Sequence, residues 1–170
     1  MHHFPTALIL ITALLLAGCF ERSPDLESPQ TYNSEQITFQ YPGNWKVSMD
    51  SGIGHLTLET PGDAIVIVQT HPAEPQLELE KLAKAFSEEF LKETPIGEMK
   101  VDSFTEQENE LGYQRFLEKF SISLLGESID HHRIYAGKET ELHDLFLIFQ
   151  SPSEDFEKTK PGFDLILKTL

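Results

Sequence analysis

Alternating apolar and polar positions occupy most of this chain, and they predict a protein built mainly of strands. Period-two alternation between turn residues favours half-buried strands, and a continuous apolar run favours a strand covered on both faces. The runs Ile65 to Val68 and Leu145 to Phe149 are of the second kind. The strands expected in this way span residues 37–41, 45–47, 55–60, 64–70, 100–106, 113–125, 127–136 and 142–151. The first two are expected to pair as a hairpin through the turn at residues 42–44.

Two segments carry the period of a helix instead. In the middle of the chain one helical face is apolar and ends before Pro95 and Gly97, with the spacing i, i+3, i+4, i+7 and i+11 at Leu79, Leu82, Ala83, Phe86 and Phe90. A second helix is expected after Pro161, with Phe163, Ile166, Leu167 and Leu170 on one face. This order predicts an α+β fold, an α/β/α sandwich whose central antiparallel sheet is covered by helices.

The N-terminus carries a targeting pattern. An apolar run from Ala7 to Leu16, too short to span a bilayer, is followed by Leu16-Ala17-Gly18-Cys19. This sequence resembles the lipobox of bacterial lipoproteins, in which the cysteine receives diacylglycerol and the chain is cut just before it. We therefore expect a signal peptide at 1–18, lipidated Cys19 within a flexible tether at 19–35, and a globular domain at 36–170. The tether assignment rests on its Ser, Pro, Glu, Asn and Gln content.

Charge narrows the set of partners. The chain carries a formal net charge of −15 and has no basic stripe, which argues against nucleic acid and against electrostatic attachment to a membrane. The expected membrane partner is the lipid bilayer, reached through acylated Cys19, and the expected location is lipid-anchored and facing the periplasm. Phe20 follows the cysteine where an aspartate usually signals inner-membrane retention in enteric bacteria, which favours the outer membrane. Cys19 is the only cysteine, so no disulfide is expected.

The globular part resembles a known superfamily. The run Phe39-x-Tyr41-Pro42-x-x-Trp45, the amphipathic helix, the long meander, and the ending Ser151-Pro152…Phe156…Pro161-x-Phe163…Leu167 are similar to the PsbP-like (Mog-type) superfamily. Its DcrB-like branch includes bacterial lipoproteins. The resemblance spans about residues 36 to 170 and implies an α/β/α sandwich that acts by binding rather than catalysis. Roles in the superfamily include support of photosystem II, binding of a nuclear-transport GTPase, and chaperoning of apolar transmembrane segments.

Motifs of catalysis are not found. The sequence contains no G-x-S-x-G, no H-E-x-x-H, no P-loop and no second cysteine. The segment Asp50-Ser51-Gly52-Ile53-Gly54 lacks the third glycine of a dinucleotide site, so a hairpin loop is the better interpretation. The acidic run Glu106 to Glu110 matches no calcium loop, and we interpret it as a solvated turn.

Histidines are the remaining candidates for a site. His131, His132 and His143 are expected on neighbouring antiparallel strands, so the register decides whether they meet. A loop at Gly137-Lys138 would place His132 opposite His143, and His131 opposite Asp144, in a possible zinc or copper site. A loop at Lys138-Glu139 would instead pair Arg133 with Asp144, Tyr135 with Leu142 and Ile129 with Ile148. Cross-strand chemistry favours the second register.

Three functions follow from these observations. The leading hypothesis is a non-enzymatic binding or assembly lipoprotein of the cell envelope, with an unidentified envelope protein as partner, no cofactor and no catalytic residue. The runner-up is a periplasmic metal-handling or hydrolytic protein that uses the histidine cluster. Between them lies a chaperone for apolar segments, which requires an exposed hydrophobic groove.

Overall fold

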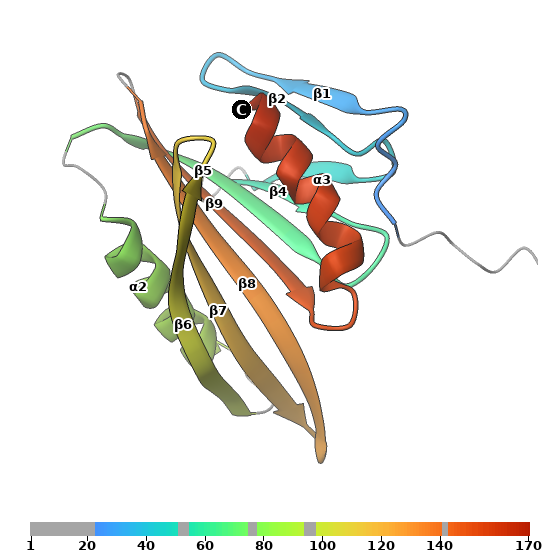
Figure 1. The fold of residues 1–170 in the computed structure, drawn as a ribbon, viewed down its shortest axis with the longest axis vertical. Helices are drawn as coiled ribbons and strands as arrows, with labels where there is room; N and C mark the ends of the chain where they lie inside the picture. The colour runs from blue at the N-terminus through green and yellow to red at the C-terminus, as the bar shows by residue number, and fades with distance from the viewer. Residues whose placement is uncertain (1–22, 51–54, 75–77, 94–97, 141–142) are drawn as a thin grey trace, which may run out of the picture.

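A seven-stranded antiparallel sheet forms the centre of the molecule (Figure 1). The structure is a computed structural model that describes residues 23–50, 55–74, 78–93, 98–140 and 143–170. The strand order is β3-β4-β5-β9-β8-β7-β6, and a separate two-stranded sheet pairs β1 with β2. The strands are β1 (Gln30–Asn33), β2 (Thr38–Tyr41), β3 (Lys46–Asp50), β4 (His55–Glu59), β5 (Ile65–Pro72), β6 (Glu98–Glu110), β7 (Tyr113–Leu124), β8 (Glu127–Glu139) and β9 (His143–Pro152). The predicted α+β class is confirmed.

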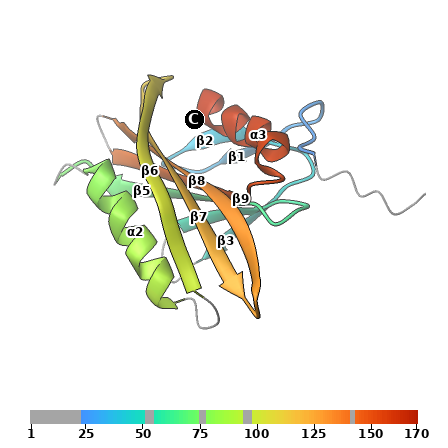
Figure 2. The same ribbon diagram turned by 60° about the horizontal axis from the view of Figure 1, so that its bottom comes forward.

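The helices of the described residues, α2 (Leu79–Glu93) and α3 (Phe156–Thr169), pack on opposite faces of this sheet (Figure 2). Helix α2 shares a core with Phe146 and Ile148 of β9, whereas helix α3 shares a larger core with Leu147 and Phe149. Alternate residues of β9 thus face the two cores, because side chains alternate along a strand. The expectation that the run Leu145 to Phe149 is covered on both faces is confirmed, since all five residues are buried.

The β1–β2 hairpin covers part of the α3 face. Phe39 and Tyr41 point into the larger core, and the backbone N–H of Gln40 donates to the Thr169 hydroxyl of α3 at 2.9 Å. The predicted pairing of 37–41 with 45–47 is wrong, because β2 pairs with β1 while β3 pairs with β4. The turn before Trp45 is a corner between two sheets, and it leads the tryptophan onto α3.

Residues 23–35 do not form the flexible tether that their composition predicts. From Ser23 onward they pack on the domain, and Gln30–Asn33 form β1. Polar side chains in this segment were expected to face solvent, but several form hydrogen bonds within the domain. One example is the bond from the Gln30 side-chain amide to the Gly43 carbonyl at 2.8 Å. Residues 19–22 lie outside the described part of the chain.

Element ends differ from prediction in two further places. Helix α3 begins at Phe156, so Pro161 lies inside it and not near its first turn; the buried Phe156 and Thr159 belong to the extra residues. The acidic run Glu106 to Glu110 is strand, not turn, and the chain reverses at Leu111 and Gly112, whose φ angles are 56° and 80°. The glycine-containing loop predicted at 50–54 lies mostly outside the described residues.

Candidate functional site

A groove of about 550 Å³ lies between the β1–β2 hairpin and strands β3 to β5. This volume is within the range of small-ligand sites. Its apolar lining comes from Tyr32, Ile37, Met49, Leu56 and Val68, and its polar lining from Ser34, Glu35, Gln36, His55 and Thr70. Because Leu56 and Val68 are buried members of the larger core, the groove opens directly onto that core.

The groove lies where the hairpin and the main sheet are not joined by strand pairing. Strand β2 packs along α3, and among the described residues the hairpin forms no strand pairing with the main sheet. A side-chain bond does cross to the main sheet, from the Thr70 hydroxyl to Gln36 Oε1 at 2.9 Å. Both residues of this bond line the groove, together with His55 and Leu56 of β4.

One rim of the groove is the edge strand β3. Met49 lies on this strand with 63% of its surface exposed, although it stands opposite Leu56 of β4. Edge strands carry backbone N–H and C=O groups that can pair with another chain. Methionine is flexible and fits apolar surfaces of many shapes. The site therefore combines an apolar floor with an open strand edge.

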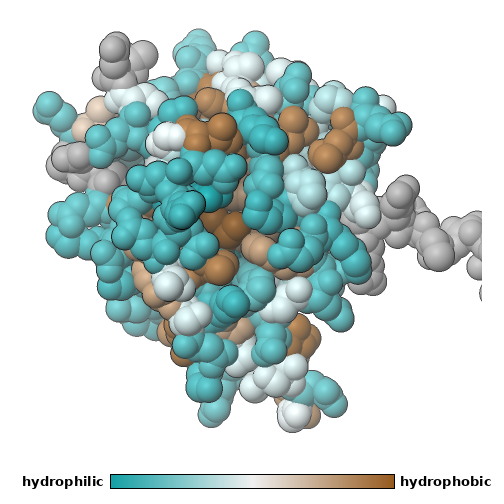
Figure 3. Space-filling view, in the orientation of Figure 1, coloured by the Kyte–Doolittle hydropathy of each residue, from teal (hydrophilic) through white to brown (hydrophobic). Residues whose placement is uncertain are grey.

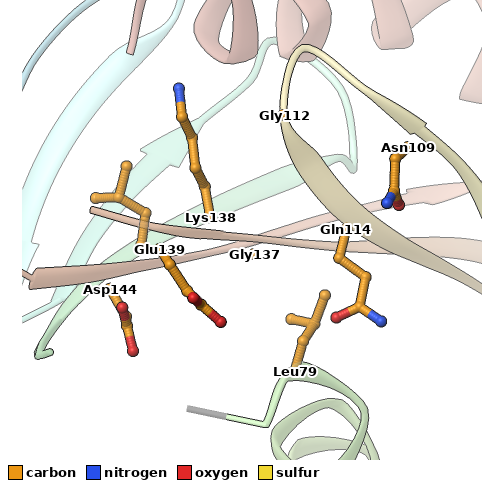
Figure 4. A pocket seen from close by; sticks show the side chains of 9 residues that line it. Leu79, Asn109, Gly112, Gln114, Gly137, Lys138, Glu139 and Asp144 are labelled. Carbon is orange, nitrogen blue, oxygen red and sulfur yellow. The ribbon is translucent and has the colours of Figure 1, made fainter. Parts of the chain in front are cut away.

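A second cavity, of about 260 Å³, lies at the start of α2 (Figure 4). Glu139 and Asp144 are opposite each other in the β8–β9 register, and Gln114, Asn109 and Leu79 also line the cavity. The Lys138 side chain points away, and its Nζ lies 5.0 Å from the centre of the Tyr113 ring. Two carboxylates beside amide groups make this cavity acidic and polar, unlike the groove.

The histidines do not converge. Strand β8 continues through Glu139, and both predicted registers are wrong: His131 faces Pro152, and His132 faces Ser151. His143 instead stands opposite Pro72 of β5. Within the described residues no group of three His, Cys, Asp or Glu is arranged to hold a metal ion.

Two local features accompany this register. Gly137 lies inside β8, where a Cβ would come within 2.9 Å of Leu79, so the glycine leaves room for α2 and does not form a turn. The connection from β8 to β9 comes later in the sequence, and at its ends the backbone N–H of Thr140 donates to the His143 carbonyl at 3.1 Å.

The two neighbouring histidines sit against aromatic rings. His131 stacks on Phe120 at 5.2 Å, and His132 meets Phe156 edge-on at 4.6 Å. Burial lowers the pKa of both imidazoles below the ordinary value of 6.5. Both histidines are therefore neutral at pH 7 and pack as aromatic side chains at the edge of the core.

An unanticipated polar cluster lies under α2. The Arg133 guanidinium is fully buried, donating from Nη1 to Glu118 at 2.9 Å and from Nε and Nη2 to Gln150 Oε1 at 2.8 and 2.6 Å. Aromatic rings surround it, at distances from 4.4 to 5.9 Å, from Phe120, Phe90, Phe86 and Tyr135. Glu118 also accepts from Ser87 of α2 at 2.5 Å. This cluster fastens α2 to the sheet.

The predicted lipidation site and its lipobox, Leu16, Ala17, Gly18 and Cys19, lie outside the described residues. Among the helices that are described, none has the length and apolar character needed to cross a bilayer. On the face seen in Figure 3, apolar side chains reach the surface in small areas between hydrophilic ones. The most exposed large apolar residue described is Leu125, at 94%, in the β7–β8 turn.

No known protein-family model matches the sequence, and no curated protein matches it significantly. Solved structures do resemble it. Cyanobacterial PsbP from Synechocystis sp. has a TM-score of 0.56 at 13% identity, covering 89% of this chain and 94% of that one. The Ran-binding protein Mog1p of Saccharomyces cerevisiae has a TM-score of 0.51 at 8% identity, covering 84% and 94%. The chain thus has the PsbP-like, Mog-type fold that its sequence resemblance implied.

Proposed function

We propose that this protein is a lipid-anchored bacterial envelope protein that works by binding, without catalysis, and that its ligand is an extended apolar segment of a partner protein. The observation that carries the proposal is the groove beside β3, where an apolar floor lies next to a strand edge that no other described strand pairs with. A partner segment in strand conformation could pair with β3 and place alternate side chains in the groove.

Burial of side chains in the groove would supply part of the binding free energy. Each Leu- or Val-sized side chain that leaves water contributes about 1.5 to 3 kcal/mol. Two or three such side chains together offset only the low end of the cost of association, about 4 to 15 kcal/mol, so strand pairing along β3 must supply the rest. Met49 supplies an adaptable wall for side chains of different shapes.

Charge further defines the partner. The formal net charge of −15 and the exposed Glu35 at the groove favour an apolar segment flanked by basic residues. The fold is compatible with protein binding, which is the role that the name of the yeast Ran-binding protein records. A chaperone for apolar segments and an assembly factor would both use the groove in this way, and the DcrB-like branch, with its lipoproteins, fits the proposed anchor.

Anchoring rests on the sequence pattern that ends at Cys19. The mature protein would begin at this cysteine, carry acyl chains there, and face the periplasm from the outer membrane. We expect labelled palmitate to enter the wild-type chain and not Cys19→Ala. A Cys19→Ala chain that still carries the label, or that stays membrane-bound after a carbonate wash, would contradict the anchor.

The groove is tested with a defined peptide of alternating leucine and serine flanked by lysines. We expect Met49→Lys to weaken its binding at least several-fold, because the ammonium would occupy the apolar rim. Leu125→Lys is the matched control, since it also replaces an exposed apolar residue but lies in the β7–β8 turn. Equal binding by both variants and the wild type would refute this use of the groove.

A further inference from the structure

The segment from Ser23 to Ser28, which we call the strap, is fixed to the turn between β2 and β3. Asn44 binds it through both polar atoms of its side-chain amide. Its Oδ1 accepts from the Asp25 backbone N–H at 2.9 Å, and its Nδ2 donates to the Ser23 carbonyl at 2.8 Å. The Gly43 backbone N–H donates to the Asp25 carbonyl at 2.9 Å. The Asp25 carboxylate in turn accepts from the backbone of Ser28 at 3.2 Å.

Gly43 makes this close approach possible. A Cβ at this position would lie 2.3 Å from the Ser28 carbonyl oxygen and 2.9 Å from the Asp25 carboxylate. Neither the strap nor the turn could keep its place with a larger residue. Gly43 thus offers a way to release the strap by a single substitution.

The strap and the groove lie at opposite ends of the β1–β2 hairpin. Gln30 pairs with Tyr41 at the strap end, and Asn33 pairs with Thr38 beside the groove loop at 34–37. Three residue steps along a strand separate these pairs by about 10 Å. The chain enters the domain at the right in Figure 1 and reaches the hairpin turn on the other side.

We propose that in the anchored protein the strap holds the Pro42–Asn44 end of the domain against the membrane surface and directs the groove away from it. This inference rests on the proposed lipidation of Cys19. Between Cys19 and Ser23 the chain can span about 14 Å when fully extended. A flexible tether from 20 to 35 would give an r.m.s. reach of about 20 to 25 Å and no fixed orientation. The groove would then receive its ligand from the aqueous side of the envelope and not from within the bilayer.

The test uses the full-length lipoprotein reconstituted in vesicles of phosphatidylethanolamine and phosphatidylglycerol. Because Cys19 is the only native cysteine and would be acylated, a fluorophore can be attached at Glu27→Cys in the strap or at Glu35→Cys by the groove. Lipids with a quencher on the headgroup report how near each label lies to the membrane. We expect several-fold stronger quenching at 27 than at 35.

Strap-release variants give the second arm. Gly43→Ala and Asn44→Ala should reduce the difference between the two labels, whereas Asn109→Ala, an exposed asparagine at the far end of β6, should leave it unchanged. Equal quenching at both labels in the wild type, or stronger quenching at 35, would overturn the orientation while leaving lipidation and groove binding intact. A chain that takes up no labelled palmitate would overturn the orientation together with its premise.

Discussion

Replacing Arg133 by methionine tests whether the polar cluster under α2 stabilises the fold. Methionine fills much of the space that the surrounding aromatic rings enclose, but it lacks the three nitrogens of arginine that donate hydrogen bonds. Glu118, which is 1% exposed, would lose its ion-pair partner at 2.9 Å and keep only the bonds from Ser87 and Tyr135. Gln150 would lose both of its donors on Oε1.

The expected magnitude follows from this geometry. Removing one member of a buried ion pair typically costs about 3 to 5 kcal/mol, because the other charge stays buried. The two remaining hydroxyl donors to Glu118 place the cost of Arg133→Met near about 3 kcal/mol. The double variant Arg133→Met/Glu118→Leu should recover much of the loss, since no unpaired charge is left. Arg115→Met is the matched control: its partner Glu110 is 60% exposed, so the ion pair should contribute about 1 kcal/mol or less.

Urea unfolding of a soluble chain starting at Phe20, followed by circular dichroism, measures these free energies. The double-variant cycle gives the coupling between Arg133 and Glu118 directly. A cost below about 1 kcal/mol for Arg133→Met, or a double variant as unstable as the two single variants combined, would show that the buried ion pair does not stabilise the fold.

Four further predictions follow from individual contacts. Gly162→Ala should destabilise the domain by about 1 to 3 kcal/mol in urea unfolding, because a Cβ would lie 2.4 Å from the Trp45 ring. Phe163→Ala, fully buried in the same core, should cost about 3 to 5 kcal/mol, and a value near zero would contradict the packing. Burial raises the pKa of Tyr113 to about 12, whereas in the unfolded chain the phenol ionises near pH 10. Between these two pH values only the unfolded state loses the proton, so the free energy of unfolding should fall as the pH rises. The fall should be smaller in Tyr113→Phe. Burial lowers the pKa of His132, so its contribution to stability is present above pH 6.5 and is lost as the pH falls, a loss that His132→Gln should reduce.

The elements with a strong periodic signal could be predicted from the sequence. Helix α2 begins at Leu79 as its apolar spacing predicts, and the continuous apolar run in β9 is buried on both faces. The packing motif that carries the family resemblance also has a visible role, because Pro42 and Trp45 lie against Gly162 of α3. These features depend on neighbours along one element, which a sequence displays directly.

Features that depend on distant contacts could not be predicted. The sequence predicted a loop at Lys138-Glu139, with Gly137-Lys138 as the alternative, but β8 continues through Glu139 and Gly137 lies inside it, next to Leu79 of α2. Composition likewise indicated a free tether, whereas Asn44 binds the strap across 19 residues of sequence. The groove residues carry an ordinary strand pattern, so Met49 gave no signal of its own. Arg133 is charged, and a charged residue is tolerated in a core only when partners such as Glu118 bind it. These partners lie on other strands, so the local sequence does not reveal them.

We propose that the groove beside β3 binds an extended apolar segment. Backbone amide NMR spectra recorded during titration with the lysine-flanked leucine–serine peptide test it most directly, because every binding surface is observed at once. We expect shifts to concentrate in β3, in the 34–37 loop and around Leu56 and Val68, and to weaken in Met49→Lys. Shifts centred instead on the acidic cavity at Glu139 and Asp144, or no shifts at any position, would show that the peptide does not bind in the groove.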